Sequence, residues 1–365
     1  MSRPLSHHKN HRAAFTLVEL MLSMAVLGVM MAVMFSVLGA TQRVYTDAQT
    51  KVEQFREARV GFEAVTRRLE QATLNTYWDY NDPANPSRYV RQSELHFITG
   101  PADKLLTQAP FQSKIGHTVF FQAPLGIAGA PAHEKMATAL NAWGYFLTCE
   151  TDNDLEMAPE FLRARIAARK RCRLMEFRQP TERLSVYAPP GGAPSGFKGL
   201  TSAAFGDTTA WFNVAGIVKD STTSPAAVIS HPIAENIIAL VISPRSPVPL
   251  TSKTAHDYDV APQYYYDSRR YLIASGTPLA EVTRHQLPPT VNVTMVALDE
   301  KSAQQYESST HSTGDLVDAT WFQDVKNYET DMQALTDRLI SQRLNFQVFS
   351  TAVSIRAAKW STVDL

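Results

Sequence analysis

The sequence predicts an α+β protein in which one long N-terminal helix is followed by a head built on an antiparallel β-sheet. Three observations predict this class: an uncharged apolar run at residues 20–39, an apolar stripe that continues beyond it at helical spacing, and a series of short alternating segments separated by Pro- and Gly-rich loops. We expect a leader at 1–14, a transmembrane part of the helix at 15–40, an exposed part at 41–80 and a β-rich head at 81–365.

The run at 20–39 is long enough to cross a bilayer. About twenty helical residues, at about 1.5 Å each, reach about 30 Å, the thickness of the hydrocarbon core. The leader before it contains no acidic residue and three basic ones, Arg3, Lys9 and Arg12. Because basic residues ahead of an apolar span favour the cytoplasmic side, we expect a single-pass inner-membrane protein with an exported C-terminal head.

The order of the small residues and the apolar run differs from that of an ordinary secretory signal, in which the cleavage site follows the apolar region. Here Ala13 and Ala14 precede the run, so cleavage between Ala14 and Phe15 would leave the span on the mature chain. The acidic residue Glu19 lies at the edge of the run, where a carboxylate in lipid needs a partner. The alternative is a plain signal-anchor helix in which Glu19 has no function.

The sequence Ala14-Phe15-Thr16-Leu17-Val18-Glu19 resembles the signal of type IV prepilins. In that family a prepilin peptidase cuts before the aromatic residue and methylates the new amino group. The resemblance therefore implies cleavage after Ala14 and N-methylation of Phe15, although the family usually has Gly where this chain has Ala14. In a filament, the desolvated Glu19 would serve assembly by pairing with the Phe15 amine of an adjacent subunit.

The helical pattern continues past the membrane span. Apolar residues recur in steps of three and four, with charged residues between them, and no proline lies between Leu5 and Pro83. We expect one helix over about 15–74 whose second half packs on the head. The apolar stripe consists of Val44, Ala48, Val52, Phe55, Phe62, Val65, Leu69 and Ala72.

The remainder of the chain is predicted to form short strands joined by loops. Alternation is clearest at 291–296 and 346–353, as in antiparallel strands with one solvated face. An amphipathic helix is expected at about 328–344, with Met332, Leu335, Leu339 and Ile340 facing inward. The expected strands are 94–99, 118–122, 143–148, 173–178, 237–242, 291–298 and 345–356.

The sequence contains two cysteines, Cys149 and Cys172, and each borders an expected strand. Antiparallel pairing of those strands would bring the two sulfurs together. An even number of cysteines in an exported chain permits a disulfide, and two buried free thiols are the alternative. Two cysteines without spaced His or Cys neighbours make a poor zinc site, so we expect no metal and no cofactor.

No motif of a familiar enzyme class is present. The sequence lacks a Gly-rich phosphate loop, HExxH, Gly-x-Ser-x-Gly and Cys-x-x-Cys, so we expect no enzyme. The formal charge is zero and no basic cluster is interleaved with aromatic residues in the exported part, so we expect no nucleic-acid partner. Tyr264, Tyr265 and Tyr266 could stack a sugar or a peptide; burial of alternate rings is the commoner outcome for such a run.

A long helix followed by an antiparallel head is the architecture of type IV pilins and pseudopilins. The segments 234–238 and 287–294 are similar to the minor pseudopilin J of type II secretion. The segments 54–59, 73–80 and 173–180 look more like the Verru_Chthon cassette protein C family, a prepilin-like group, and this second resemblance covers more of the chain.

These resemblances imply a minor pilin or pseudopilin-like structural subunit of a type IV pilus or type II secretion-like filament, with its head in the periplasm or on the filament. Its partners would be prepilin peptidase, other pilin or pseudopilin subunits and inner-membrane lipid. The alternative is a membrane-anchored binding module. In that case the loops at 188–199 and 243–270 would recognise a substrate or surface ligand, since long loops on a rigid scaffold often carry binding residues.

Overall fold

The structure is a computed structural model. It describes residues 17–81, 84–109, 113–129, 138–151, 169–187, 209–213, 227–247, 258–269, 284–307 and 311–360, and the single positions 111, 132, 135, 136, 217, 219 and 220. The chain divides into two units, Met1–Glu53 and Gln54–Leu365. The second unit holds the end of the long helix and the whole head.

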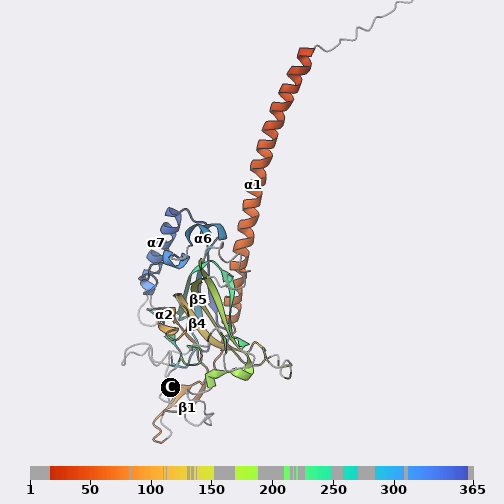
Figure 1. Cartoon of the computed structure of the whole chain (residues 1–365). Helices are drawn as coiled ribbons and strands as arrows, with labels where there is room; N and C mark the ends of the chain where they lie inside the picture. Colours follow the sequence, from red (N-terminus) through yellow and green to blue (C-terminus); the bar gives the residue numbers. More distant parts are fainter. Residues whose placement is uncertain are drawn as a thin grey trace, which may run out of the picture. The chain divides into compact units, whose positions relative to one another are not determined.

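The long helix α1 extends from Leu17 to Leu69 and is coloured red in Figure 1. Within the head unit its buried residues are spaced by three or four, as expected for a helix with one apolar face. They are Ala58, Gly61, Val65 and Leu69, with Phe55 and Phe62 half-buried beside them. The prediction that the second half of the helix packs on the head is confirmed. Val44, which we expected in the stripe, is exposed, and the side chains of Ala48 and Val52 lie outside the described residues.

The helix ends before residue 74, where we expected its end. The backbone amide of Ala72 donates to the Leu69 carbonyl at 3.1 Å, which tightens the last turn, and Thr73 then donates to the Gln122 carbonyl at 2.9 Å. From Thr73 onward the backbone therefore bonds to a strand of the head and no longer to the helix. Residues 77–80, which we placed in the exposed part of the helix, instead form strand β1 (Tyr77–Tyr80), paired with β2 (Tyr89–Gln92).

The larger sheet has six antiparallel strands in the order β11-β3-β4-β5-β6-β9. Its central strands are buried on both faces over most of their length, and residues 142–147 of one of them accordingly form an unbroken apolar run. The strands are Tyr266–Asp267 (β11), Ile98–Pro101 (β3), Lys114–Ala123 (β4), Asn141–Thr151 (β5), Lys170–Gln179 (β6) and Ser230–Glu235 (β9).

The smaller sheet has three antiparallel strands in the order β10-β12-β13. These strands are Ile237–Arg245 (β10), Thr290–Leu298 (β12) and Phe346–Ser354 (β13). The short strands Lys219–Asp220 (β7) and Ala227–Val228 (β8) pair separately. The described helices of the head are α2 (Ala102–Leu105), α6 (Glu300–Tyr306) and α7 (Tyr328–Ser341), and Figure 1 shows α6 and α7 at the end of the head opposite β1.

Most of the predicted strands are confirmed within a few residues at their ends. The exception is 94–99, because β3 begins only at Ile98. Upstream of it, the His96 amide donates to the Gln122 side chain at 2.7 Å instead of to a neighbouring strand. In α7, Leu335 and Leu339 are buried as predicted, but Ile340 is 60% exposed. Ile340 follows Leu339 directly, and one residue turns a helix by about 100°.

Three apolar clusters hold these layers together. The first lies between α1, one face of the larger sheet and the inner face of the smaller sheet. The second covers the opposite face of the larger sheet, where the Phe120 ring stacks on Phe212 with centroids 4.0 Å apart. The third joins α7 to the outer face of the smaller sheet. The smaller sheet is thus covered on both faces, by α1 and the larger sheet on one and by α7 on the other.

Cys149 and Cys172 lie opposite each other in the β5–β6 pair and form a disulfide bond. Both residues are buried. The bond joins the two strands next to residues 152–169, which connect them. It therefore holds the ends of that connection together whatever its conformation.

Arg68 joins the last turns of α1 to the larger sheet. Its guanidinium pairs with Glu176 of β6, donates to the Tyr145 hydroxyl at 3.0 Å and lies 4.4 Å from the centre of the Trp143 ring. The Tyr145 hydroxyl also donates to Glu176 at 3.1 Å. The Glu176 side chain is 3% exposed, so its charge requires these partners. We call Arg68, Trp143, Tyr145 and Glu176 the helix clamp.

We predict that Arg68→Met lowers the free energy of unfolding by about 3 kcal/mol, because the buried Glu176 carboxylate loses its counter-charge. Arg67→Met is the matched control, since Arg67 pairs with Glu63 at the surface and should contribute less than about 0.5 kcal/mol. Urea unfolding of the detergent-solubilised chain, followed by tryptophan fluorescence, measures both. Equal losses in the two variants would contradict the clamp.

Candidate functional site

The first part of α1 has the properties of a membrane-spanning segment. Within the described residues, Leu17–Thr46 is the one stretch of helix long and apolar enough to cross a bilayer, judged by length and composition. Its large apolar side chains are exposed, including Met21, Phe35 and Val37. A continuous exposed apolar surface of this kind is rare in water and suits lipid or other apolar helices.

Two hydroxyl side chains in this segment are satisfied within the helix. The Ser23 hydroxyl donates to the Leu20 carbonyl and the Thr41 hydroxyl donates to the Val37 carbonyl, both at 2.9 Å. Such bonds to the preceding turn allow hydroxyls to enter an apolar medium without losing a hydrogen bond. These two hydroxyls therefore enter a bilayer with their donors satisfied.

Glu19 lies in the first turn of α1 and its side chain is exposed. A carboxylate at this position is favoured by the partial positive charge of a helix N-terminus. The other two predicted site residues, Ala14 and Phe15, lie outside the described residues. Cleavage between them and methylation of Phe15 therefore remain predictions.

The protein-family model described as the prokaryotic N-terminal methylation motif matches residues 9–35 of the sequence. This range includes Ala14, Phe15 and Glu19 and the beginning of the apolar part of α1.

The chain has a type IV pilin-like N-terminus.

The matched motif is the sequence that prepilin peptidase recognises, and subunits carrying it assemble with one another. Together with the apolar helix it is consistent with a membrane-anchored structural subunit. No curated protein and no solved structure matches the chain. The motif match ends at residue 35 and therefore does not cover any part of the head.

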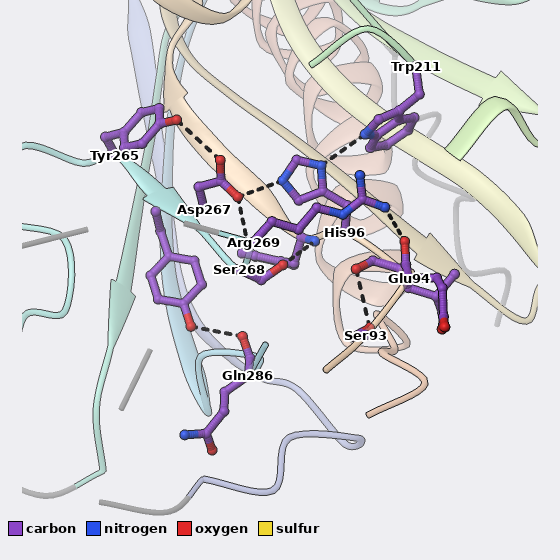
Figure 2. A network of polar contacts seen from close by, with 12 residues as sticks. Ser93, Glu94, His96, Trp211, Tyr265, Asp267, Ser268, Arg269 and Gln286 are labelled. Carbon is purple, nitrogen blue, oxygen red and sulfur yellow. Dashed lines mark hydrogen bonds and ion pairs between the residues drawn. The ribbon is translucent and has the colours of Figure 1, made fainter. Parts of the chain in front are cut away.

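A buried polar network in the head surrounds His96 and Asp267. Figure 2 shows the His96 ring between the Asp267 carboxylate and the Trp211 indole. His96 Nε2 lies 2.7 Å from Asp267 Oδ1, and Trp211 Nε1 donates to His96 Nδ1 at 3.0 Å. Asp267 also accepts from the Arg269 amide at 2.8 Å, and the Arg269 guanidinium donates to the Glu94 carbonyl.

This His–Asp pair lacks the geometry of a general base. Because Trp211 donates to Nδ1, the ring proton must be on Nε2, which donates it to Asp267. No ring nitrogen is left to accept a proton from a nucleophile, and both side chains are fully buried. The Ser268 hydroxyl accepts from the Phe97 amide at 3.0 Å. The network therefore ties β11 and Trp211 to the residues just before β3, and its role is structural.

The run of three tyrosines behaves as the commoner reading predicted. Tyr264 and Tyr266 are fully buried, whereas Tyr265 is half-buried. The Tyr266 hydroxyl donates to the Gln286 carbonyl at 2.8 Å. Among the described residues no group of three or more His, Cys, Asp or Glu side chains could hold a metal ion.

The helix clamp and the His96 network were not predicted from the sequence. Arg68 and Glu176 are far apart in the chain, as are His96 and Asp267, and no local pattern pairs them. One signal was present. Glu176 lies between the apolar residues Met175 and Phe177 of an expected strand, and a charge at such a position usually has a buried partner.

His117 in β4 is a second buried histidine and is held neutral. Its Nδ1 accepts from the Ile242 amide and its Nε2 donates to the Phe322 carbonyl, both at 3.0 Å. Burial lowers the pKa of His117 to about 4. In the unfolded chain its pKa is about 6.5, so between these values the unfolded state binds more protons than the folded state. Stability is therefore lost as the pH falls from about 6.5 towards 4.

We predict that this histidine contributes about 3 kcal/mol to the difference in unfolding free energy between pH 7 and pH 4. The His117→Gln variant should show a pH-dependent loss smaller by that amount than the wild-type chain, whatever its stability at pH 7. Urea unfolding at a series of pH values measures the two curves. Parallel curves would show that His117 is already protonated, or accessible to protons, in the folded state.

Proposed function

We propose that the chain is a minor pilin or pseudopilin-like structural subunit, anchored in the inner membrane and assembled through α1 into a type IV pilus or type II secretion-like filament. The observation that carries the proposal is the methylation motif at residues 9–35, which leads directly into the exposed apolar part of α1. The resemblances to the Verru_Chthon cassette protein C family and to pseudopilin J support this reading of the head.

The helix supplies the two surfaces that such a subunit needs. Its first part exposes large apolar side chains that lipid covers before assembly and neighbouring helices cover afterwards. Its last turns bury Ala58, Val65 and Leu69 against the head. One helix can thus be anchored in the membrane, pack in a filament and retain its head, which would lie in the periplasm or on the filament.

Glu19 gives the assembly its specificity in this proposal. Packing among apolar helices removes the carboxylate from water, which is costly without an opposite charge. Cleavage before Phe15 creates a new amino group four positions earlier in the chain. In a neighbouring subunit this amine is available to Glu19, so that processing and assembly are chemically coupled.

We predict that Glu19→Gln reduces recovery in sheared filaments by at least about tenfold, because the buried amine of the neighbour loses its counter-charge. The amount of the Glu19→Gln variant in the membrane should equal that of the wild-type chain, since the apolar span is intact. Glu63→Gln is the control, as Glu63 is an exposed acid on the same helix. Immunoblots of filament and membrane fractions measure both variants. If Glu19→Gln is recovered as well as wild type, the pairing does not occur.

We also predict that the mature chain begins with an N-methylated Phe15. Mass spectrometry of the N-terminal peptide of the membrane-extracted protein measures this directly. Ala14→Gly should be processed, whereas Ala14→Leu should not, because the peptidase accepts a small residue there. A mature start at Met1 or Ser2 would indicate a plain signal anchor. A start near Ala40 would mean that the helix is discarded, and the pilin-like proposal would fail.

A further inference from the structure

A cavity of about 520 Å³ lies in the head on the outer face of the three-stranded sheet, where α7 begins. Its volume is within the range of small-molecule binding sites. Strands β10, β12 and β13 form its floor, and residues around the start of α7 form part of its wall. Four lining residues, Ser243, Arg245, Asp259 and Tyr264, come from the segment in which the sequence predicted ligand-binding loops.

At the cavity, the side chains on this face of the sheet change from apolar to polar. Where α7 covers the face, Ile238 and Val296 pack with Leu335 and Leu339. Beyond Tyr328, the first residue of the helix, the floor is largely polar. Its residues in register are Val241, Thr294 and Ser350 in one row and Ser243, Asn292 and Ala352 in the next. Polar side chains replace apolar ones where the helix no longer covers the sheet.

Several lining groups are available to a ligand. Thr294 exchanges hydrogen bonds with the Tyr328 hydroxyl at 2.8 Å and the Ser350 hydroxyl at 2.9 Å. In the described structure the side chains of Ser243 and Asn292 make no hydrogen bond, although both line the cavity. The buried Tyr264 hydroxyl also has no hydrogen-bond partner. Backbone groups contribute little, because β12 is paired on both edges.

Among the described residues that line the cavity, the charges balance. Arg245 pairs with Asp259 at 3.1 Å, and Lys326 and Glu329 add one charge of each sign. The lining therefore favours neither an anion nor a cation. Tyr328 adds aromatic surface, and the Tyr264 backbone has a φ of 60°, a conformation that is rare for a bulky residue and occurs often at functional sites.

We propose that this cavity binds a neutral saccharide. Sugars present many hydroxyls, which suit the Ser, Thr and Asn side chains of the floor, and apolar C–H faces, which suit the half-buried ring of Tyr328. An extended peptide fits less well, because peptides that bind to sheets usually pair with an exposed edge, and this floor is a sheet face. The site is built wholly from the head, so the proposal goes beyond filament assembly and does not depend on it.

The test is isothermal titration calorimetry of the full chain in lauryldimethylamine oxide, a detergent without a sugar headgroup. The neutral probes are maltotriose, cellotriose and triacetylchitotriose; the comparison probes are trigalacturonate, which is acidic, and trialanine, a peptide. We expect at least one neutral trisaccharide to bind with a Kd of about 1 mM or tighter. Trigalacturonate and trialanine should bind more weakly than that sugar.

Three variants locate the binding. Ala352→Trp should abolish it by filling the cavity, and Asn292→Leu should weaken it about threefold to tenfold by removing one hydrogen-bonding side chain. Ser354→Trp is the control, because Ser354 is an exposed residue of the same strand that does not line the cavity. Thermal unfolding confirms that each variant is folded. The proposal is overturned if no neutral trisaccharide binds, if a comparison probe binds more tightly, or if folded Ala352→Trp and Asn292→Leu bind as wild type does.

Discussion

The ion pair between Arg68 of α1 and Glu176 of β6 is the interaction on which the arrangement of the head depends. Glu176 lies in a strand whose neighbouring residues are apolar, and its carboxylate is removed from water. The cation that neutralises it is on the helix, so loss of that contact would leave the carboxylate only the Tyr145 hydroxyl and His231, whose Nε2 lies 3.4 Å away. The pair fixes which face of the helix meets the sheet.

The same contact brings the apolar stripe of α1 into the first core cluster. Val65 and Leu69 are then buried with Trp143, Leu147 and Leu174 of the larger sheet. Gly61 permits a close approach, since a Cβ atom there would lie 3.0 Å from that of Ala234. Without the helix, this face of the sheet would expose its largest apolar side chains. The last turns of α1 are therefore part of the fold of the head.

The two parts of α1 meet different physical requirements. In the first part the hydroxyls of Ser23 and Thr41 are bonded within the helix, and apolar side chains face outward. In the second part apolar residues occupy one face, and charged residues such as Glu63 and Arg67 occupy another. A methylation motif followed by a helix of this kind is consistent with a membrane-anchored structural subunit.

Much of the fold followed from local sequence patterns. The length of α1, the strands around Cys149 and Cys172 and the two alternating strands β12 and β13 could be predicted because each pattern lies within a few neighbouring residues. The pairing of Arg68 with Glu176 and of His96 with Asp267 could not, since their partners are brought together only by the folded sheet. The cavity was foreseen only as a loop region, because its floor comes from three strands that are separated in the chain.

The most direct test of the central claim is photo-crosslinking in intact membranes. The photoreactive amino acid p-benzoylphenylalanine is placed at Met24, an exposed apolar position of α1, and adducts are identified by mass spectrometry. A filament subunit predicts adducts with the apolar N-terminal helices of other proteins that carry the methylation motif, or with a second copy of this chain. A protein that is inserted, correctly processed and still free of any such adduct would contradict assembly through this helix.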